Sequence, residues 1–225
     1  MTRIKRRVGL HGLNQRWLLA ITVFLTGSLV SSAAGAISWT PHPVLANFHD
    51  VIFDGNQFWA VEDNGLVQVS PDGATWTSAA PGPSYNFYGI AHGGGGQYVV
   101  VGAGSGGTNV DHSVYVTNNG GLTWSQATVS STWFNVTFFS VAHGATAGEY
   151  VAVGGGGVIR RSTDGGATWS PSPQYWYYYW LSKVIYAPIG TGLYVAVGDA
   201  GSILTSNDGG VTWTAQYAPG TVFCP

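Results

Sequence analysis

A short turn sequence of the form Ser/Thr-x-Asp/Asn-Gly-Gly-x-Thr-Trp occurs four times in this chain and constrains its fold more than any other feature. The four copies end at Trp76, Trp124, Trp169 and Trp213, which are separated by 48, 45 and 44 residues. A period of this length is typical of solenoids and propellers, in which each repeat is one structural unit. The sequence therefore predicts four units of similar architecture.

Each repeat contains three apolar segments ahead of the strand that begins at its Thr-Trp pair. The second segment is apolar throughout, as in Tyr98–Val101 and Tyr150–Val153, which predicts a strand buried on both faces. Four short antiparallel strands in about 45 residues describe one propeller blade. We therefore expect an all-β propeller of about four four-stranded blades. Their expected ranges are 46–80, 84–128, 134–172 and 178–217.

The completeness of the ring is left open by the sequence. Ser38-Trp39-Thr40 resembles the closing strand of a blade but has no preceding strands of its own. Four blades could close with an extra strand, the ring could be incomplete, or two chains could complete one another. We favour an incomplete ring.

The repeated turn has a structural explanation. Its acidic or amide side chain can accept hydrogen bonds from the backbone amides next along the chain, and its glycines tolerate the positive φ of a tight turn. Its tryptophan supplies a large apolar surface between blades. We therefore expect structural and not catalytic roles for Asp72, Asn119, Asp164 and Asp208, and for Trp76, Trp124, Trp169 and Trp213.

The third and fourth copies resemble the Asp-box (BNR) repeat family in full. Asp164, Gly166, Thr168 and Trp169 match its Ser-x-Asp-x-Gly-x-Thr-Trp motif, whereas the first copy is one residue shorter and the second has Asn119 for Asp. The family includes sialidases, xyloglucan-degrading hydrolases, sortilin-type receptors and the photosystem II assembly and stability factor. The wider repeat context is most similar to the last of these. The resemblance implies a propeller but not one particular function.

The first 36 residues resemble a secretory signal peptide. Basic residues precede an apolar run from Trp17 to Val30, and small residues continue from there to Ala36, which is the order of a cleaved leader. We expect a secreted or periplasmic protein that is not stably inserted in a membrane, with a retained anchor as the alternative. Cleavage would leave three basic residues against ten carboxylates, a net charge of −7, which argues against a nucleic-acid partner.

One end of the propeller is predicted to carry the functional groups. The loops between second and third strands and the connectors between blades meet there, whereas the Asp-containing turns lie at the opposite end. Six consecutive aromatic residues in one connector cannot all face a core if the segment is extended, because successive side chains alternate. The candidate binding residues at this end are Glu62, Asp63, Asp111, His112, Asp199, Tyr175, Trp176, Tyr178 and Trp180.

Exposed aromatic rings beside carboxylates are typical of both sugar-binding and protein-binding surfaces. We expect a non-catalytic scaffold for a protein or carbohydrate, with self-association through open blade edges as a further expectation. The alternative is a glycoside hydrolase that uses Asp63 and Asp199 as paired carboxylates. We expect no cofactor and no metal, since His92 and His143 have no third ligand nearby in the sequence.

Overall fold

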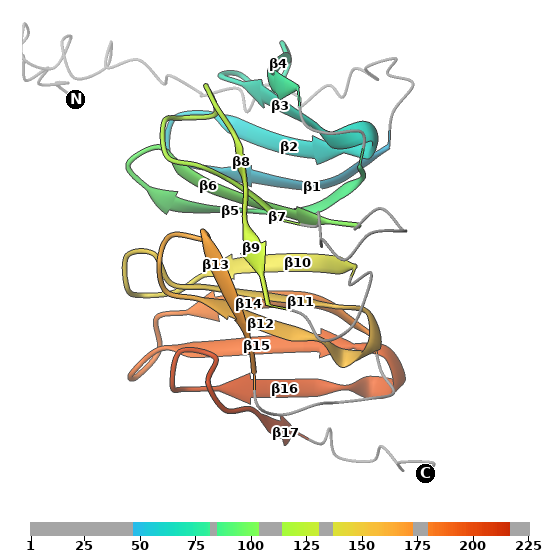
Figure 1. The fold of residues 1–225 in the computed structure, drawn as a ribbon, viewed down its shortest axis with the longest axis vertical. Coiled ribbons are helices and arrows are strands. Elements are labelled where there is room, and N and C mark those ends of the chain that lie inside the picture. The colour runs from blue at the N-terminus through green and yellow to red at the C-terminus, as the bar shows by residue number, and fades with distance from the viewer. Residues whose placement is uncertain (1–46, 82–84, 104–113, 131–136, 173–179, 217–225) are drawn as a thin grey trace, which may run out of the picture. The chain divides into compact units, whose positions relative to one another are not determined.

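The computed structural model describes residues 47–81, 85–103, 114–130, 137–172 and 180–216. Within these ranges the chain forms β-strands and three short 3-10 turns (Figure 1). No helix in the described ranges is long and apolar enough to cross a membrane. The predicted leader, residues 1–36, lies outside them.

Four sheets, here called blades 1 to 4, are each built from four strands that are consecutive in sequence and pair antiparallel. Blade 1 contains β1 (Phe48–Phe53), β2 (Phe58–Glu62), β3 (Leu66–Ser70) and β4 (Thr77–Pro81). Blade 2 contains β5 (Phe87–Gly94), β6 (Gln97–Gly102), β7 (Val114–Thr117) and β8 (Ser125–Gln126). Blade 3 contains β10 (Phe138–His143), β11 (Tyr150–Gly154), β12 (Ile159–Ser162) and β13 (Thr168–Pro171). Blade 4 contains β14 (Leu181–Ala187), β15 (Leu193–Gly198), β16 (Ile203–Ser206) and β17 (Thr214–Gln216). The predicted all-β fold of four-stranded blades is confirmed.

One strand crosses from its own blade to the next. β9 (Thr128–Val129) comes after blade 2 in sequence but pairs in parallel with β13 of blade 3 (Figure 1). Backbone hydrogen bonds of 2.8 Å from Thr128 to Ala167 and of 2.9 Å from Ser130 to Trp169 hold this pairing. The outer edges of blades 2 and 3 are therefore joined by main-chain bonds as well as by side-chain packing.

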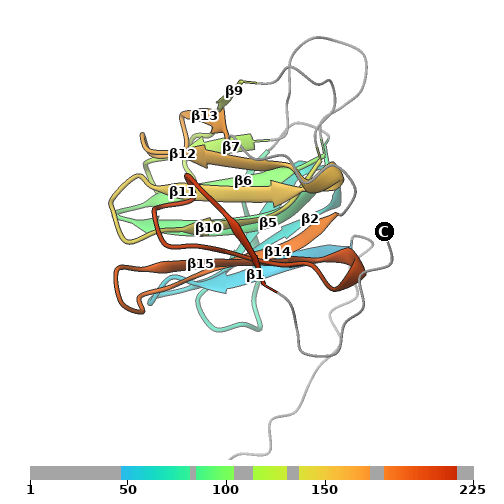
Figure 2. The same cartoon turned by 90° about the horizontal axis from the view of Figure 1, so that it is seen from below.

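The core lies between blades. Three apolar clusters fill the three spaces between consecutive sheets, and the first strands β5 and β10 lie against each other (Figure 2). β6 and β11 are buried on both faces, as their unbroken apolar sequence predicts. Trp169 and Trp213 are almost fully buried in these clusters, because each lies between its own blade and the preceding one.

The Asp-containing turns connect the third strand of each blade to the fourth. Asp164 accepts hydrogen bonds from the Thr168 amide at 2.9 Å, from the Thr168 hydroxyl at 2.5 Å and from the Ser162 hydroxyl at 2.8 Å. The Trp169 indole donates to the carbonyl of Gly166 at 2.7 Å. The side chains of this turn therefore close it through hydrogen bonds of their own.

In the shorter first copy, Gly73 takes the place of the second glycine. Its amide donates to the Ser70 hydroxyl at 2.8 Å, as the amide of Gly166 does to Ser162 in the third copy. The turn therefore keeps its serine contact with one residue fewer.

The opposite end of three blades is formed by 3-10 turns between the second and third strands. These turns are η1 (Asp63–Gly65), η2 (Gly155–Gly157) and η3 (Asp199–Gly201). Their central residues have positive φ, including Asn64 at 65° and Ala200 at 52°. In Figure 1 this end of the blades lies on the right and the Asp-containing turns on the left.

Candidate functional site

Every first strand contains a β-bulge at the end of the blade that carries the 3-10 turns. The pairing register shifts between Phe48 and Asp50, and equivalent shifts occur in β5, β10 and β14. The skipped residues are His49, Tyr88, Phe139 and Ser182. A bulge redirects a side chain out of the regular sheet alternation and is frequent at barrel rims and binding sites.

Three of the skipped residues are aromatic, and together with Trp180 they form a continuous line of rings across all four blades. Ring centroids are 4.8 Å apart for His49 and Tyr88, 5.9 Å for Tyr88 and Phe139, and 5.5 Å for Phe139 and Trp180. We call these four residues the aromatic row. Trp180 is 57% exposed, so the row opens to solvent at its blade 4 end.

The blade 1 end of the row is polar and negatively charged. His49 Nε2 lies 2.7 Å from Asp63 Oδ1, and the Asn47 amide group donates to Asp63 Oδ2 at 2.8 Å. These hydrogen bonds, first from His49 and then from Asn47, lower the pKa of Asp63 below its usual range. Asp63 is therefore an ionised acceptor held in place by two neighbours.

A second acidic group lies on the same side of blade 1. Asp50 accepts the amide of Ile90 in blade 2 at 3.2 Å and forms an ion pair with Lys183 of blade 4, also at 3.2 Å. The first strands of blades 1 and 4 are thus close enough for a salt bridge. This contact links β1 and β14, the strands at the two ends of the aromatic row.

One backbone hydrogen bond recurs in every blade and fixes the row relative to the loops. The backbone carbonyl just before each first strand accepts a hydrogen bond of 2.9 to 3.1 Å from the backbone amide that follows the second strand. The accepting residues are Asn47, Asn86, Thr137 and Trp180. The donors in blades 1 and 4 are Asp63 and Asp199. These two aspartates therefore occupy equivalent positions in their blades.

The other predicted binding residues have different environments. Glu62 is 2% exposed and accepts a hydrogen bond from Gln68 at 3.0 Å. Its expected place on a binding surface does not fit this burial, because β2 continues into the core as far as Glu62 before η1 begins. Asp199 and Trp180 are exposed. Asp111, His112, Tyr175, Trp176 and Tyr178 lie outside the described residues.

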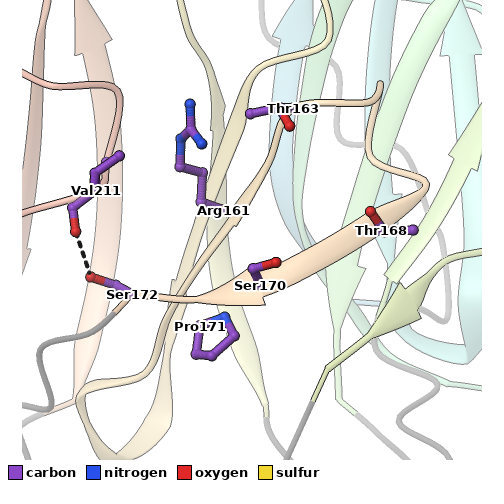
Figure 3. A pocket seen from close by; sticks show the side chains of 8 residues that line it. Arg161, Thr163, Thr168, Ser170, Pro171, Ser172 and Val211 are labelled. Atoms are coloured by element: carbon purple, nitrogen blue, oxygen red, sulfur yellow. Dashed lines mark hydrogen bonds between the residues drawn. The ribbon is translucent and has the colours of Figure 1, made fainter.

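A shallow pocket lies elsewhere, between the outer parts of blades 3 and 4 (Figure 3). Its volume is about 160 Å³, below the range of several hundred Å³ typical of small-molecule sites. Two of its polar side chains already serve the contact between blades: Arg161 donates to the Gly209 carbonyl at 2.5 Å and Ser172 to the Val211 carbonyl at 3.2 Å. We assign this pocket to packing.

The two repeated histidines lie near the ends of the first strands of blades 2 and 3. His92 stacks on Tyr98 with centroids 4.7 Å apart, and His143 lies edge-on to Tyr150 at 4.9 Å. Burial lowers the pKa of His143. Among the described residues, no three His, Cys, Asp or Glu side chains lie close enough to share a metal ion.

The sequence analysis missed the aromatic row as a unit. The signal was present, because each first strand opens with an apolar residue and then His, Tyr, Phe or Ser. Its meaning depends on the bulge, which turns the second residue out of the strand, and a register shift cannot be recognised from one sequence.

Comparison with known proteins supports the Asp-box assignment. The BNR/Asp-box repeat model matches residues 160–171. No curated protein matches the chain significantly. The structure of YCF48 bound to D1 peptide is similar with a TM-score of 0.58 and 22% identity, and that of YCF48 from Cyanidioschyzon merolae with 0.52 and 22%. The matches cover 81% and 79% of this chain.

A GH74 xyloglucanase from Xanthomonas campestris is also similar, with a TM-score of 0.55, 20% identity and 76% of this chain covered. This chain spans 58% of the length of each YCF48 chain and 24% of the xyloglucanase. Identities this low show the fold alone. The chain carries Asp-box repeats and folds as propeller blades.

Proposed function

We propose that this chain is an exported, non-catalytic propeller scaffold that binds an extended protein segment along the aromatic row. The observation that carries the proposal is the row itself, with four rings from four different blades in mutual contact. Rings that remain partly accessible beside charged groups are favoured anchors for protein partners. The similarity to a YCF48 structure with a bound peptide supports a protein partner.

The size of the row suggests the length of the segment. The centroid distances along it trace a path of about 16 Å. An extended chain rises about 3.3 Å per residue, so roughly five residues would span the four rings.

The charges suggest its composition. Asp63, Asp50 and Asp199 lie at this end of the blades, and Lys183 is already paired with Asp50. A segment with apolar side chains for the rings and a basic side chain for Asp63 or Asp199 would match this surface.

The hydrolase alternative has less support. A glycosidase needs one carboxyl group with a raised pKa to protonate the leaving group, whereas the pKa of Asp63 is lowered by its hydrogen bonds. Asp63 could then serve only as the ionised partner of the pair. We therefore retain the hydrolase as a control in the test and not as a second proposal.

Selection of peptides of about eight residues from a random displayed library on the immobilised protein tests the proposal. We expect selected peptides rich in apolar and basic residues. We expect Trp180→Ala to weaken their binding by about tenfold or more, since loss of an aromatic anchor in an interface costs this much. The matched control is Leu122→Ala, because Leu122 is exposed but lies on the turn with Asn119 at the opposite end.

Peptides that bind the Trp180→Ala protein as tightly as the parent would contradict the proposed site. Xyloglucan oligosaccharides titrated in parallel distinguish the carbohydrate alternative. If the protein releases reducing ends from xyloglucan oligosaccharides, and Asp63→Asn and Asp199→Asn abolish this release, the protein is an enzyme and the scaffold proposal is wrong.

A further inference from the structure

Every contact between consecutive blades has the same direction. One face of each blade, which we call its leading face, packs on the next blade in sequence, and the other, its trailing face, packs on the preceding blade. Gln97 and Val99 of β6 lie on a leading face. The trailing face of blade 3 meets Gln97 with Tyr150 and Val99 with Gly166. A blade therefore joins its neighbours head to tail.

A tyrosine hydroxyl closes each of the three internal joints. Tyr98 donates to Asp54 at 2.5 Å, Tyr150 to Gln97 at 2.9 Å and Tyr194 to Glu149 at 2.9 Å. The donor tyrosine is the first or second residue of the second strand of its blade. The acceptor belongs to the preceding blade. We call this contact the tyrosine latch.

A glycine contact accompanies each latch. The second glycine of the Asp-containing turn lies against the second strand of the preceding blade, so closely that a Cβ atom on it would meet Trp59, Val99 or Val151 at 2.5 to 3.0 Å. The three glycines are Gly121, Gly166 and Gly210. Each joint thus combines one polar latch with one close backbone approach.

Two faces with this design have no partner among the described residues. On the trailing face of blade 1, Val51 is 58% exposed, whereas its counterparts Ile90 and Val184 are 2% and 1% exposed. On the leading face of blade 4, Ile185 is 53% exposed, whereas its counterpart Ala142 is buried. Apolar side chains exposed on faces that are buried in the other blades are candidates for an interaction surface.

One face lacks the donor of the latch and the other lacks the acceptor. Blade 1 has Phe58 where the other blades have tyrosine, so the donor hydroxyl is absent. Blade 4 has Leu193 where blades 2 and 3 have the acceptors Gln97 and Glu149. A buried hydroxyl or carboxamide without a partner is costly, and the two free faces lack donor and acceptor together.

The remaining features of a joint are retained on the same faces. Val195 of blade 4 corresponds to Val99 and Val151, and Gly73 of blade 1 corresponds to the second glycine of the other turns. The leading face of blade 4 and the trailing face of blade 1 are therefore complementary in an apolar version of the internal joint.

We propose that the leading face of blade 4 in one copy of this chain docks head to tail on the trailing face of blade 1 in a second copy. Two such contacts related by a twofold axis form a closed ring from two copies, because a heterologous contact closes when its rotation allows it. Phe58 then packs on Leu193 of the partner subunit in place of the latch. This inference is independent of the function proposed for the aromatic row.

The test measures the mass of the full chain by sedimentation velocity, together with Ile185→Arg on the leading face and Val51→Arg on the trailing face. We expect two copies per particle for the parent and monomers for each variant alone, since every contact then contains one buried arginine. Equal mixing of the two variants restores association through one contact per pair, because the blade 4 face of Val51→Arg and the blade 1 face of Ile185→Arg remain intact. The second contact of the mixed pair holds both arginines and stays open. Leu122→Arg, at an exposed residue away from both faces, is the matched control and keeps the parent mass.

A double-mutant cycle identifies the pair. Phe58→Tyr and Leu193→Gln alone are each expected to raise the dissociation constant of self-association by about tenfold, and the double variant restores it by rebuilding a tyrosine latch. A monomeric parent protein overturns the proposal. Coverage of these faces by residues 1–46 or 217–225 of the same chain would give that result. Association that is lost in only one arginine variant, or in neither, also overturns it.

Discussion

At the scale of single residues, the Asp-containing turns show how an amide can replace a carboxylate. Asn119 accepts the amide of Thr123 at 3.0 Å through the same oxygen position that Asp164 uses for Thr168. Its side-chain nitrogen then donates to the Thr123 hydroxyl at 2.8 Å, so the direction of that bond is reversed. The turn geometry therefore depends on a planar acceptor more than on charge.

The carboxylates do, however, link stability to pH. Burial would raise the pKa of Asp164, but hydrogen bonds from Thr168 and Ser162 outweigh it and lower this pKa. The amides of Thr75 and Ala74, with the Ser70 hydroxyl, lower the pKa of Asp72 to about 2. Because folding lowers these pKa values, the stabilisation is complete above the ordinary value of 3.8 and is lost as the pH falls below it, toward about 2 for Asp72.

We predict that Asp164→Asn costs little free energy of unfolding at pH 7 and weakens the loss of stability as the pH falls below the ordinary value of 3.8. Asp164→Ala should cost about 1 to 2 kcal/mol at pH 7, because it leaves the Thr168 amide without its acceptor. Urea unfolding of both variants and the parent at pH 7 and pH 3 measures these differences. An Asn variant as unstable at pH 7 as the Ala variant would show that the charge itself is required.

At the scale of elements, the spacing between two blades depends on a glycine with a positive φ that also lies close to the preceding blade. Gly166 has a φ of +86°, and a Cβ atom on it would lie 2.6 Å from Val99 Cγ2 in the preceding blade. Gly94 has a similar φ of +88° but has no atom within 4 Å of that position. Substitutions at Gly94 and Gly166 therefore separate the cost of backbone strain from the cost of packing one sheet on another.

We predict that Gly94→Ala destabilises the protein by about 1 kcal/mol, the cost of a left-handed residue with a Cβ atom. Gly166→Ala should cost about 1 to 3 kcal/mol more, because the methyl group forces blades 2 and 3 apart. Thermal or urea unfolding of the two variants gives the comparison. Equal losses would mean that the sheets yield without cost, contrary to the close approach of Gly166 to the preceding blade.

The sequence predicted the strands and turns of this fold better than it predicted contacts between repeats. The Asp-containing turns and the buried strands β6 and β11 result from local rules of turn chemistry and apolar patterning. The tyrosine latch joins Tyr150 to Gln97, 53 residues away, and no local pattern reveals that pairing. Glu62 was misplaced because the end of β2 could not be distinguished from the start of a loop.

At the scale of the whole molecule, the terminal blades differ from the inner ones in exposure although their sequences are similar. β11 is buried at every residue, whereas β15 alternates between buried and accessible residues and exposes Val197. The same sequence pattern therefore gives different burial according to whether the described residues include a next blade. Local stability is expected to track this difference, since segments with fewer buried contacts open more readily.

We predict that amide hydrogens of β15 exchange faster than those of β11 in dilute protein. Exchange in β15 should slow as the protein concentration rises and a second copy covers its leading face, while exchange in β11 should not change. Hydrogen-exchange mass spectrometry at two concentrations reads both segments in one experiment. Slow exchange in β15 that does not depend on concentration would indicate that blade 4 is stable with its face open.

The uniform direction of the joints also bears on how such a chain can change its length over evolutionary time. A duplicated copy of blade 3 would bring its own Glu149, Tyr150 and Gly166, so it could be inserted after the original and meet both neighbours with contacts already present in the chain. Recombination between repeats can therefore add or remove whole blades without inventing a new contact. Blade number is then free to drift among descendants, whereas the tyrosine and the close glycine of each inner joint stay the same.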